Sequence, residues 1–134
     1  MRIVLPIALT ALSAAPLAAE TYTCAFDQND FPENALLQET VSLSIDRSSG
    51  DLAVVSGITD AAGIDMLIVT NDDDAQIVFQ WMLSLENLVD GGTGMVQFVA
   101  HIMKGDGIAE QTAIVTGNDN AGEASAVGSC TAEN

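Results

Sequence analysis

The chain has few positive charges. Lysine and arginine together number 3 against 19 aspartates and glutamates, so the 134 residues carry a formal net charge of −16 at pH 7. Such a surface repels phosphate backbones and anionic lipid headgroups, which argues against nucleic-acid binding and attachment to a membrane surface. It attracts cations and basic proteins, although dispersed acidity also serves solubility alone.

The chain lacks an apolar run of the roughly 18 residues that predict a membrane-spanning helix. Its first 19 residues carry Arg2, a short apolar stretch and then small residues, the order of a secretory signal. We expect cleavage after Ala19, which leaves residues 20–134 as a single domain of charge −17 because Arg2 is lost. Thr23 precedes Cys24 where a lipoprotein signal has a small residue, so no membrane anchor is expected. The sequence predicts a periplasmic or secreted protein.

Cysteine is scarce as well. Only Cys24 and Cys130 occur, near opposite ends of the expected mature chain, and no metal-binding or redox spacing joins them to other ligands. In an oxidising compartment an isolated pair most simply forms one disulfide. We therefore predict a bond between them.

The residues of the common catalytic constellations are missing. His101 is the only histidine, and no nucleophile elbow, zinc-protease motif or Cys/His arrangement accompanies it. We interpret His101 as a surface or packing residue, expect no cofactor, and favour a protein that is not an enzyme. A hydrolase is the least favoured function.

The mature sequence is dominated by alternation of apolar and polar residues, the period of a half-buried strand. It predicts eight strands, at residues 21–26, 41–46, 51–57, 64–70, 77–85, 96–102, 108–116 and 123–130. Residues 30–38 predict a short helical turn or irregular plug with Asp30 as its cap, and residues 58–63 predict a loop.

Evenly spaced strands without helical crossovers predict an all-β fold, an eight-stranded antiparallel up-and-down barrel, with a β-sandwich as the alternative. Small residues flank Cys130 and aromatic residues flank Cys24, so the last strand fits beside the first. A terminal disulfide would then close the barrel.

The two central strands predict their own register. If Trp81 lies opposite Phe98, an antiparallel pair also places Leu83 by Val96, Phe79 by Ala100 and Ile77 by Ile102. Five aromatic residues fall on the predicted inner faces: Tyr22, Phe26, Phe79, Trp81 and Phe98. We expect this bulk to fill the interior rather than leave a chamber for a ligand.

The outer face of the same two strands is rich in methionine. It predicts an apolar stripe that adapts to partners; its candidate residues are Val78, Met82, Met95, Val99, His101 and Met103. Partial burial of both faces is an equal alternative.

Carboxylates on the predicted turns are weak candidates for calcium ligands, namely Asp72, Asp73, Asp74 and Asp119. Neither segment matches the twelve-residue calcium-loop pattern, so solvated turns are favoured and no metal site is predicted.

The opening Tyr22-Thr23-Cys24, the central Phe79-Gln80-Trp81 and the closing Gly128-Ser129-Cys130 resemble a group of small exported bacterial β-barrel proteins. The Tyr-x-Cys start is also similar to that of periplasmic lysozyme inhibitors, whose Ser-Gly-x-x-Tyr motif has no counterpart here. These resemblances imply architecture more than activity. The favoured function is a noncatalytic periplasmic binding module for a basic envelope protein or a small ligand; a lipocalin-like carrier of an apolar ligand and a lysozyme-inhibitor-like protein are the alternatives.

Overall fold

The computed structural model describes residues 19–32, 36–87, 94–117 and 122–133. These residues form eight antiparallel strands in one sheet, so the predicted all-β barrel is confirmed. The strands are β1 (Glu20–Phe26), β2 (Thr40–Ile45), β3 (Leu52–Val55), β4 (Met66–Asp72), β5 (Gln76–Ser84), β6 (Met95–Met103), β7 (Ile108–Thr116) and β8 (Gly122–Glu133). The predicted signal segment lies outside the described residues, apart from Ala19.

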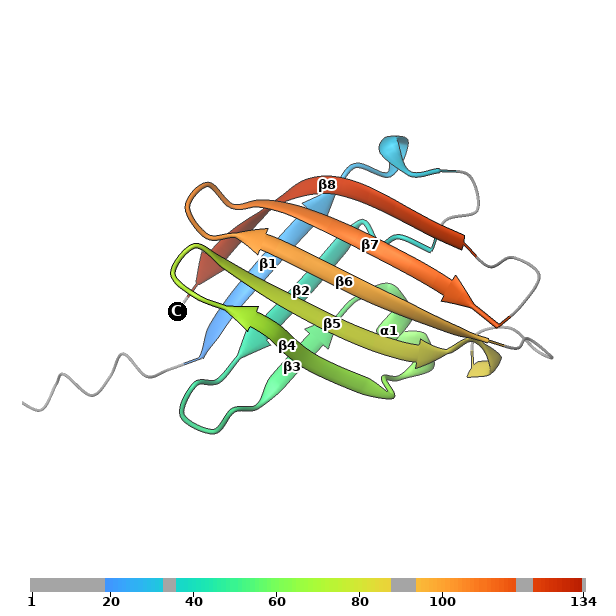
Figure 1. Ribbon diagram of the computed structural model, residues 1–134, viewed down its shortest axis with the longest axis horizontal. Coiled ribbons are helices and arrows are strands. Elements are labelled where there is room, and N and C mark those ends of the chain that lie inside the picture. The colour runs from blue at the N-terminus through green and yellow to red at the C-terminus, as the bar shows by residue number, and fades with distance from the viewer. Residues whose placement is uncertain (1–18, 33–35, 88–93, 118–121, 134) are drawn as a thin grey trace, which may run out of the picture.

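Neighbouring strands in the sheet are also consecutive in the sequence, except where the first strand pairs with the last. Its order is β3-β2-β1-β8-β7-β6-β5-β4, so β1 pairs with β8 and the two free edges are β3 and β4. Strand β8 is long because it serves two neighbours: its first part pairs with β7 and its last part with β1. Figure 1 shows β8 bending from the layer of β5–β7 toward the layer of β1–β3.

Gly128 lies where β8 changes partner, opposite Phe26. A Cβ atom at this position would stand 2.1 Å from the Ala25 carbonyl oxygen and 2.6 Å from Phe26 Cδ1. Glycine is therefore required for the close approach of β8 to β1. The expected fit of small against large residues at this join is confirmed.

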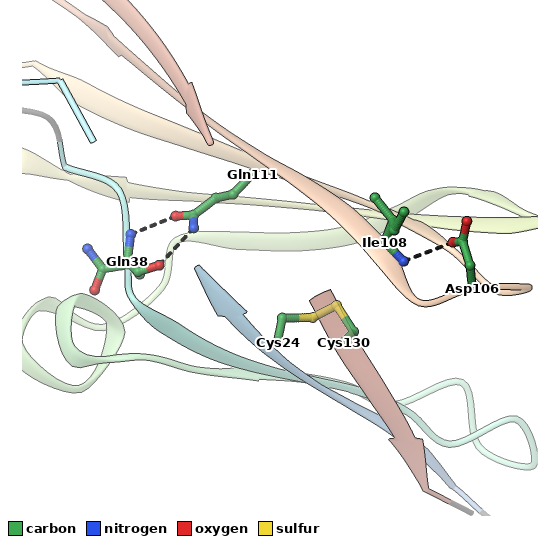
Figure 2. The surroundings of a disulfide bond; sticks show 6 residues. All are labelled: Cys24, Gln38, Asp106, Ile108, Gln111 and Cys130. Atoms are coloured by element: carbon green, nitrogen blue, oxygen red, sulfur yellow. Dashed lines mark hydrogen bonds between the residues drawn. A yellow bond between two sulfur atoms is a disulfide. The ribbon is translucent and has the colours of Figure 1, made fainter. Parts of the chain in front are cut away.

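The disulfide lies at the same join. Cys24 and Cys130 are direct partners in the β1–β8 register, and their bond spans 106 residues of sequence. Figure 2 shows the bond between the two strands. The predicted pairing and its position between first and last strand are confirmed.

The interior is apolar and aromatic. Strands β5 and β6 pair in the predicted register, with Trp81 opposite Phe98 and Leu83 opposite Val96. The Trp81 and Phe98 rings stack at 5.3 Å between centroids, and both are 0% exposed. All five aromatic residues predicted to point inward are buried, none more than 5% exposed.

Two irregular segments differ from the predictions. Residues 58–63, predicted as a loop, belong mostly to helix α1 (Gly57–Ala62), which begins with a capping box between Ser56 and Thr59. The predicted cap Asp30 is wrong: a 3₁₀ turn at Gln28–Asp30 comes earlier and is capped by Asp27, whose carboxylate accepts from the Asn29 amide at 2.9 Å. Six residues are too few for a helical period to show in the sequence of α1. Asp27 acts as the cap of the 3₁₀ turn because its short side chain reaches the free amide of the second residue, Asn29.

Part of the predicted plug packs against the core, although residues 33–35 lie outside the described residues. Leu37 is buried, and Gln38 forms a bridge to the buried Gln111 of β7. The backbone amide of Gln38 donates to Gln111 Oε1 at 2.8 Å, and Gln111 Nε2 donates to the backbone carbonyl of Gln38 at 2.9 Å (Figure 2). The Gln38 side chain also accepts from the first turn of α1, at Ile58 N.

Candidate interaction surface and charged network

The predicted methionine stripe lies on the outer face of β5 and β6. Val78 stands opposite His101, and the rows above it hold Gln80 opposite Val99 and Met82 opposite Gln97. The middle of the stripe is half-buried, whereas Met95 and Met103 at its ends are 37% and 40% exposed. Glutamine side chains therefore interrupt the stripe, and its exposed apolar surface lies at the two ends.

A second apolar group, missed in the sequence, adjoins Met103. Ile108 begins β7 across the hairpin and is 49% exposed, and Val127 of β8 is 59% exposed. Ile108 pairs with Ser129 and Val127 with Glu110, so the two apolar side chains are diagonal neighbours on the outer face. We call Met103, Ile108 and Val127 the β6–β8 apolar patch. The available signal in the sequence was the outward position of these residues in alternating strands.

Acidic residues border this patch. The Asp106 carboxylate accepts from the Ile108 amide at 3.0 Å (Figure 2), which fixes it in the β6–β7 turn, and Glu110 lies exposed between His101 and Val127. An apolar centre with a charged border is the usual anatomy of a protein-binding surface. This border is negative and so favours a partner with basic residues around an apolar contact.

His101 points outward beside Gln76 on the neighbouring strand. Its Nε2 and Gln76 Oε1 form a polar contact, and Val78 and Glu110 are its direct cross-strand neighbours. This environment leaves His101 half-buried. It gives the ring a structural partner on the outer face of the sheet.

A charged network occupies the end of the barrel where β1 begins. Arg47, in the β2–β3 turn, donates to Asp72 of β4 at 2.6 and 3.2 Å and to Glu20 of β1 at 2.9 Å. Lys104, in the β6–β7 turn, donates to the same Asp72 at 3.1 Å. The Tyr22 hydroxyl donates to Glu20 at 3.2 Å. Both cations of the expected mature chain therefore serve one cluster.

The network shifts the pKa values of its members. The Arg47 guanidinium lowers the pKa of the Glu20 and Asp72 carboxyls below their ordinary range, and their hydrogen bonds in turn raise the pKa of Arg47. Burial, followed by the nearby Glu20 charge and hydrogen bond, raises the pKa of Tyr22 to about 12. The carboxylates are thus ionised and the phenol neutral over the physiological range.

Two of the four calcium candidates have other partners. Asp72 is held by Arg47 and Lys104, and Asp73 accepts from the Ala75 and Gln76 amides at 2.8 and 2.9 Å, which shapes the β4–β5 turn. Asp74 is exposed in that turn, and Asp119 lies outside the described residues. In the part of the chain that the structure describes, no three potential metal ligands come together.

A small hollow adjoins both the disulfide and the network. Its volume is about 170 Å³, and its walls include Tyr22, Ile102, Lys104 and Cys130. A drug-sized ligand usually occupies a pocket of about 300 Å³ or more. The hollow therefore suits only a small group, such as the tip of a partner side chain.

Within the described ranges, no helix has the length and apolar character needed to cross a bilayer. Comparison of the chain with protein-family models, with curated proteins and with solved structures gave no match.

Proposed function

We propose that this protein is a noncatalytic binding module of the bacterial envelope that engages a basic protein through the β6–β8 apolar patch. The observation that carries the proposal is the patch itself. Its three large apolar side chains, 40–59% exposed, lie on the three neighbouring strands β6, β7 and β8, with Asp106 and Glu110 at the border. Exposed apolar groups of this kind mark interaction surfaces.

The barrel interior supports action through the outer surface. Trp81, Phe79 and Phe98 are 0% exposed and Tyr22 and Phe26 are 5% exposed, so large side chains occupy the space that a carrier would keep for its ligand. The patch lies on three paired strands, which hold its backbone in place before a partner arrives. Preorganisation of this kind reduces the entropy that is lost on binding.

Features of the sequence and the disulfide support the proposed compartment, and the net charge supports a basic partner. The signal-like N-terminus and the Cys24–Cys130 disulfide favour a periplasmic or secreted protein. With a formal charge of −17 after signal removal, two copies repel each other, whereas a basic protein is attracted. The acidic border of the patch directs that attraction to the apolar centre.

A paired pull-down tests the proposal. The mature protein and an Ile108→Ser/Val127→Ser variant are immobilised and exposed to a bacterial envelope extract at about 50 mM and about 500 mM NaCl, and captured proteins are identified by mass spectrometry. We expect a basic protein that the double variant fails to retain. Its affinity, measured with the purified protein by calorimetry, should fall at least tenfold in the variant, since two central apolar contacts are lost.

Val55→Ser is the matched control. Val55 is 53% exposed, as Ile108 and Val127 are, but it lies on β3 away from the patch. A partner lost equally from the Val55 variant, or retained by the double variant, would contradict the proposed surface. Quenching of Trp81 fluorescence by an apolar probe that also raises the melting temperature would instead favour a carrier.

A further inference from the structure

The barrel has one interval without a backbone ladder. Strands β3 and β4 are the two ends of the sheet order, and no hydrogen bond between them occurs among the described residues. Leu52 and Val54 of β3 and Leu67 and Val69 of β4 pack against the core beside this interval. Apolar side chains therefore flank the interval on the core side, while no backbone ladder joins the two described strands across it.

Both edges are blunted against pairing with another chain. Strand β3 has only four residues, and the pairing of β4 with β5 is interrupted by a bulge between Val69 and Asn71. Short and bulged strands are common ways of protecting a sheet edge. The interval is therefore better suited to open and close than to accept an added strand.

Its two ends are held in different ways. At one end the chain itself crosses the interval, because α1 connects β3 to β4. At the other end the β2–β3 turn lies near the end of β4, and the Arg47–Asp72 ion pair joins them, with N–O distances of 2.6 and 3.2 Å. Arg47 also reaches Glu20 at the start of β1, which anchors the turn to the strand that pairs with β2.

Lys104 contacts the same carboxylate but does not cross the interval. It belongs to the β6–β7 turn, on the β4–β8 side, and its backbone amide already donates to Ala75 of the β4–β5 turn at 2.9 Å. Its ion pair with Asp72 therefore joins elements that the sheet already holds together. Arg47 and Lys104 thus both carry a positive charge and both pair with Asp72, but they connect different elements.

We propose that Arg47 is a latch across the β3–β4 interval, and that the barrel opens there first when its ion pairs are broken. The groups facing the guanidinium are the Asp72 carboxylate from β4 and the Glu20 carboxylate from β1. Around them stand the Lys104 ammonium and the Tyr22 hydroxyl. Acid, by protonating both carboxylates, and high salt, by screening them, release the latch. This inference is independent of the proposed binding function.

Hydrogen exchange of the disulfide-bonded mature protein at pH 7 tests the latch. The variants are Arg47→Gln and, as the matched control, Lys104→Gln. We expect Arg47→Gln to accelerate exchange of the β3 amides bonded to β2 and the β4 amides bonded to β5 by about three- to tenfold, with β6 and β7 unchanged. Lys104→Gln should leave β3 and β4 within about twofold of the wild type.

Two further measurements keep the test decisive. Adding Asp72→Asn to the Arg47→Gln variant should accelerate β3 and β4 exchange little further, because the contact that the two residues share is already lost. About 1 M NaCl should reproduce the Arg47→Gln pattern in the wild type. Equal acceleration by Arg47→Gln and Lys104→Gln would overturn the latch. Acceleration spread evenly over all strands would also overturn it, because the network would then stabilise the whole fold without controlling this interval.

Discussion

Replacing both cysteines by alanine removes the covalent join between β1 and β8. The bond closes a sequence separation of 106 residues. On the chain-entropy model a loop of that length restricts the unfolded chain by about 4.8 kcal/mol at 25 °C. Six residue pairs between β1 and β8 still hold the strands together in the folded variant, so its native state should persist. We expect the free energy of unfolding to fall by about 2–5 kcal/mol.

Urea unfolding followed by Trp81 fluorescence measures this loss. With a slope of about 1.5–2 kcal/mol per M, a loss near 4 kcal/mol lowers the midpoint by about 2–3 M. The slope itself should increase in the double variant, because an unfolded chain without the cross-link exposes more surface.

Reduction of the wild type under the same conditions should give the same midpoint as the Cys24→Ala/Cys130→Ala variant. A loss below about 1 kcal/mol would refute the argument from loop entropy. The argument would also be refuted if the alanine variant lost the expected stability but the reduced wild type did not. The loss would then arise from packing of the alanines and not from the missing bond.

Further predictions follow from the join, the plug and the network. Gly128→Ala should lower the free energy of unfolding in urea by about 1–3 kcal/mol, because the new Cβ would meet the Ala25 carbonyl. Gly122→Ala in the same strand, where a Cβ meets open space, should change it by less than about 1 kcal/mol. Gln111→Leu should cost about 1–3 kcal/mol and remove exchange protection from the Gln38 amide, while Gln97→Leu on the outer face should do neither. Ultraviolet titration of Tyr22, the only tyrosine, should give a pKa of about 12, and a value near 10 would contradict its burial. Because folding raises that pKa, the corresponding stability is complete below pH 10 and is lost as the pH rises toward 12. The opposite holds for Glu20 and Asp72, because folding lowers the pKa of both carboxyls. The corresponding stability is present above the ordinary carboxyl range and is lost as the pH falls below about 4. Arg47→Gln should reduce this acid-dependent loss of stability.

The register of the central hairpin could be predicted from the sequence because side-chain alternation permits only one face to be buried. Once Trp81 and Phe98 are placed opposite each other, every other pair of β5 and β6 follows. The meeting of Cys24 with Cys130 could be predicted for a related reason, since two cysteines allow a single intramolecular pairing. Both inferences depend on local pattern or on elimination.

Other features depend on contacts that no local pattern encodes. Helix α1 has only six residues, and its capping box uses Thr59 where glutamate or glutamine is the recognisable signal. The free edges at β3 and β4, and the meeting of Arg47 with Asp72 and Glu20, are set by how the sheet closes. The β6–β8 apolar patch combines residues of three strands whose mutual stagger also follows from closure.

The pairing of the first strand with the last makes this chain suited to circular permutation. Thr21 and Glu133 are partners in the β1–β8 register, so a short linker can join the two ends of the segment 20–134. New ends placed between β3 and β4 would give a chain that runs from β4 through β8 and then from β1 to β3, the order of the sheet itself. Every strand would then pair only with its neighbours in sequence, and the lower contact order should let the permuted barrel fold faster than the natural one.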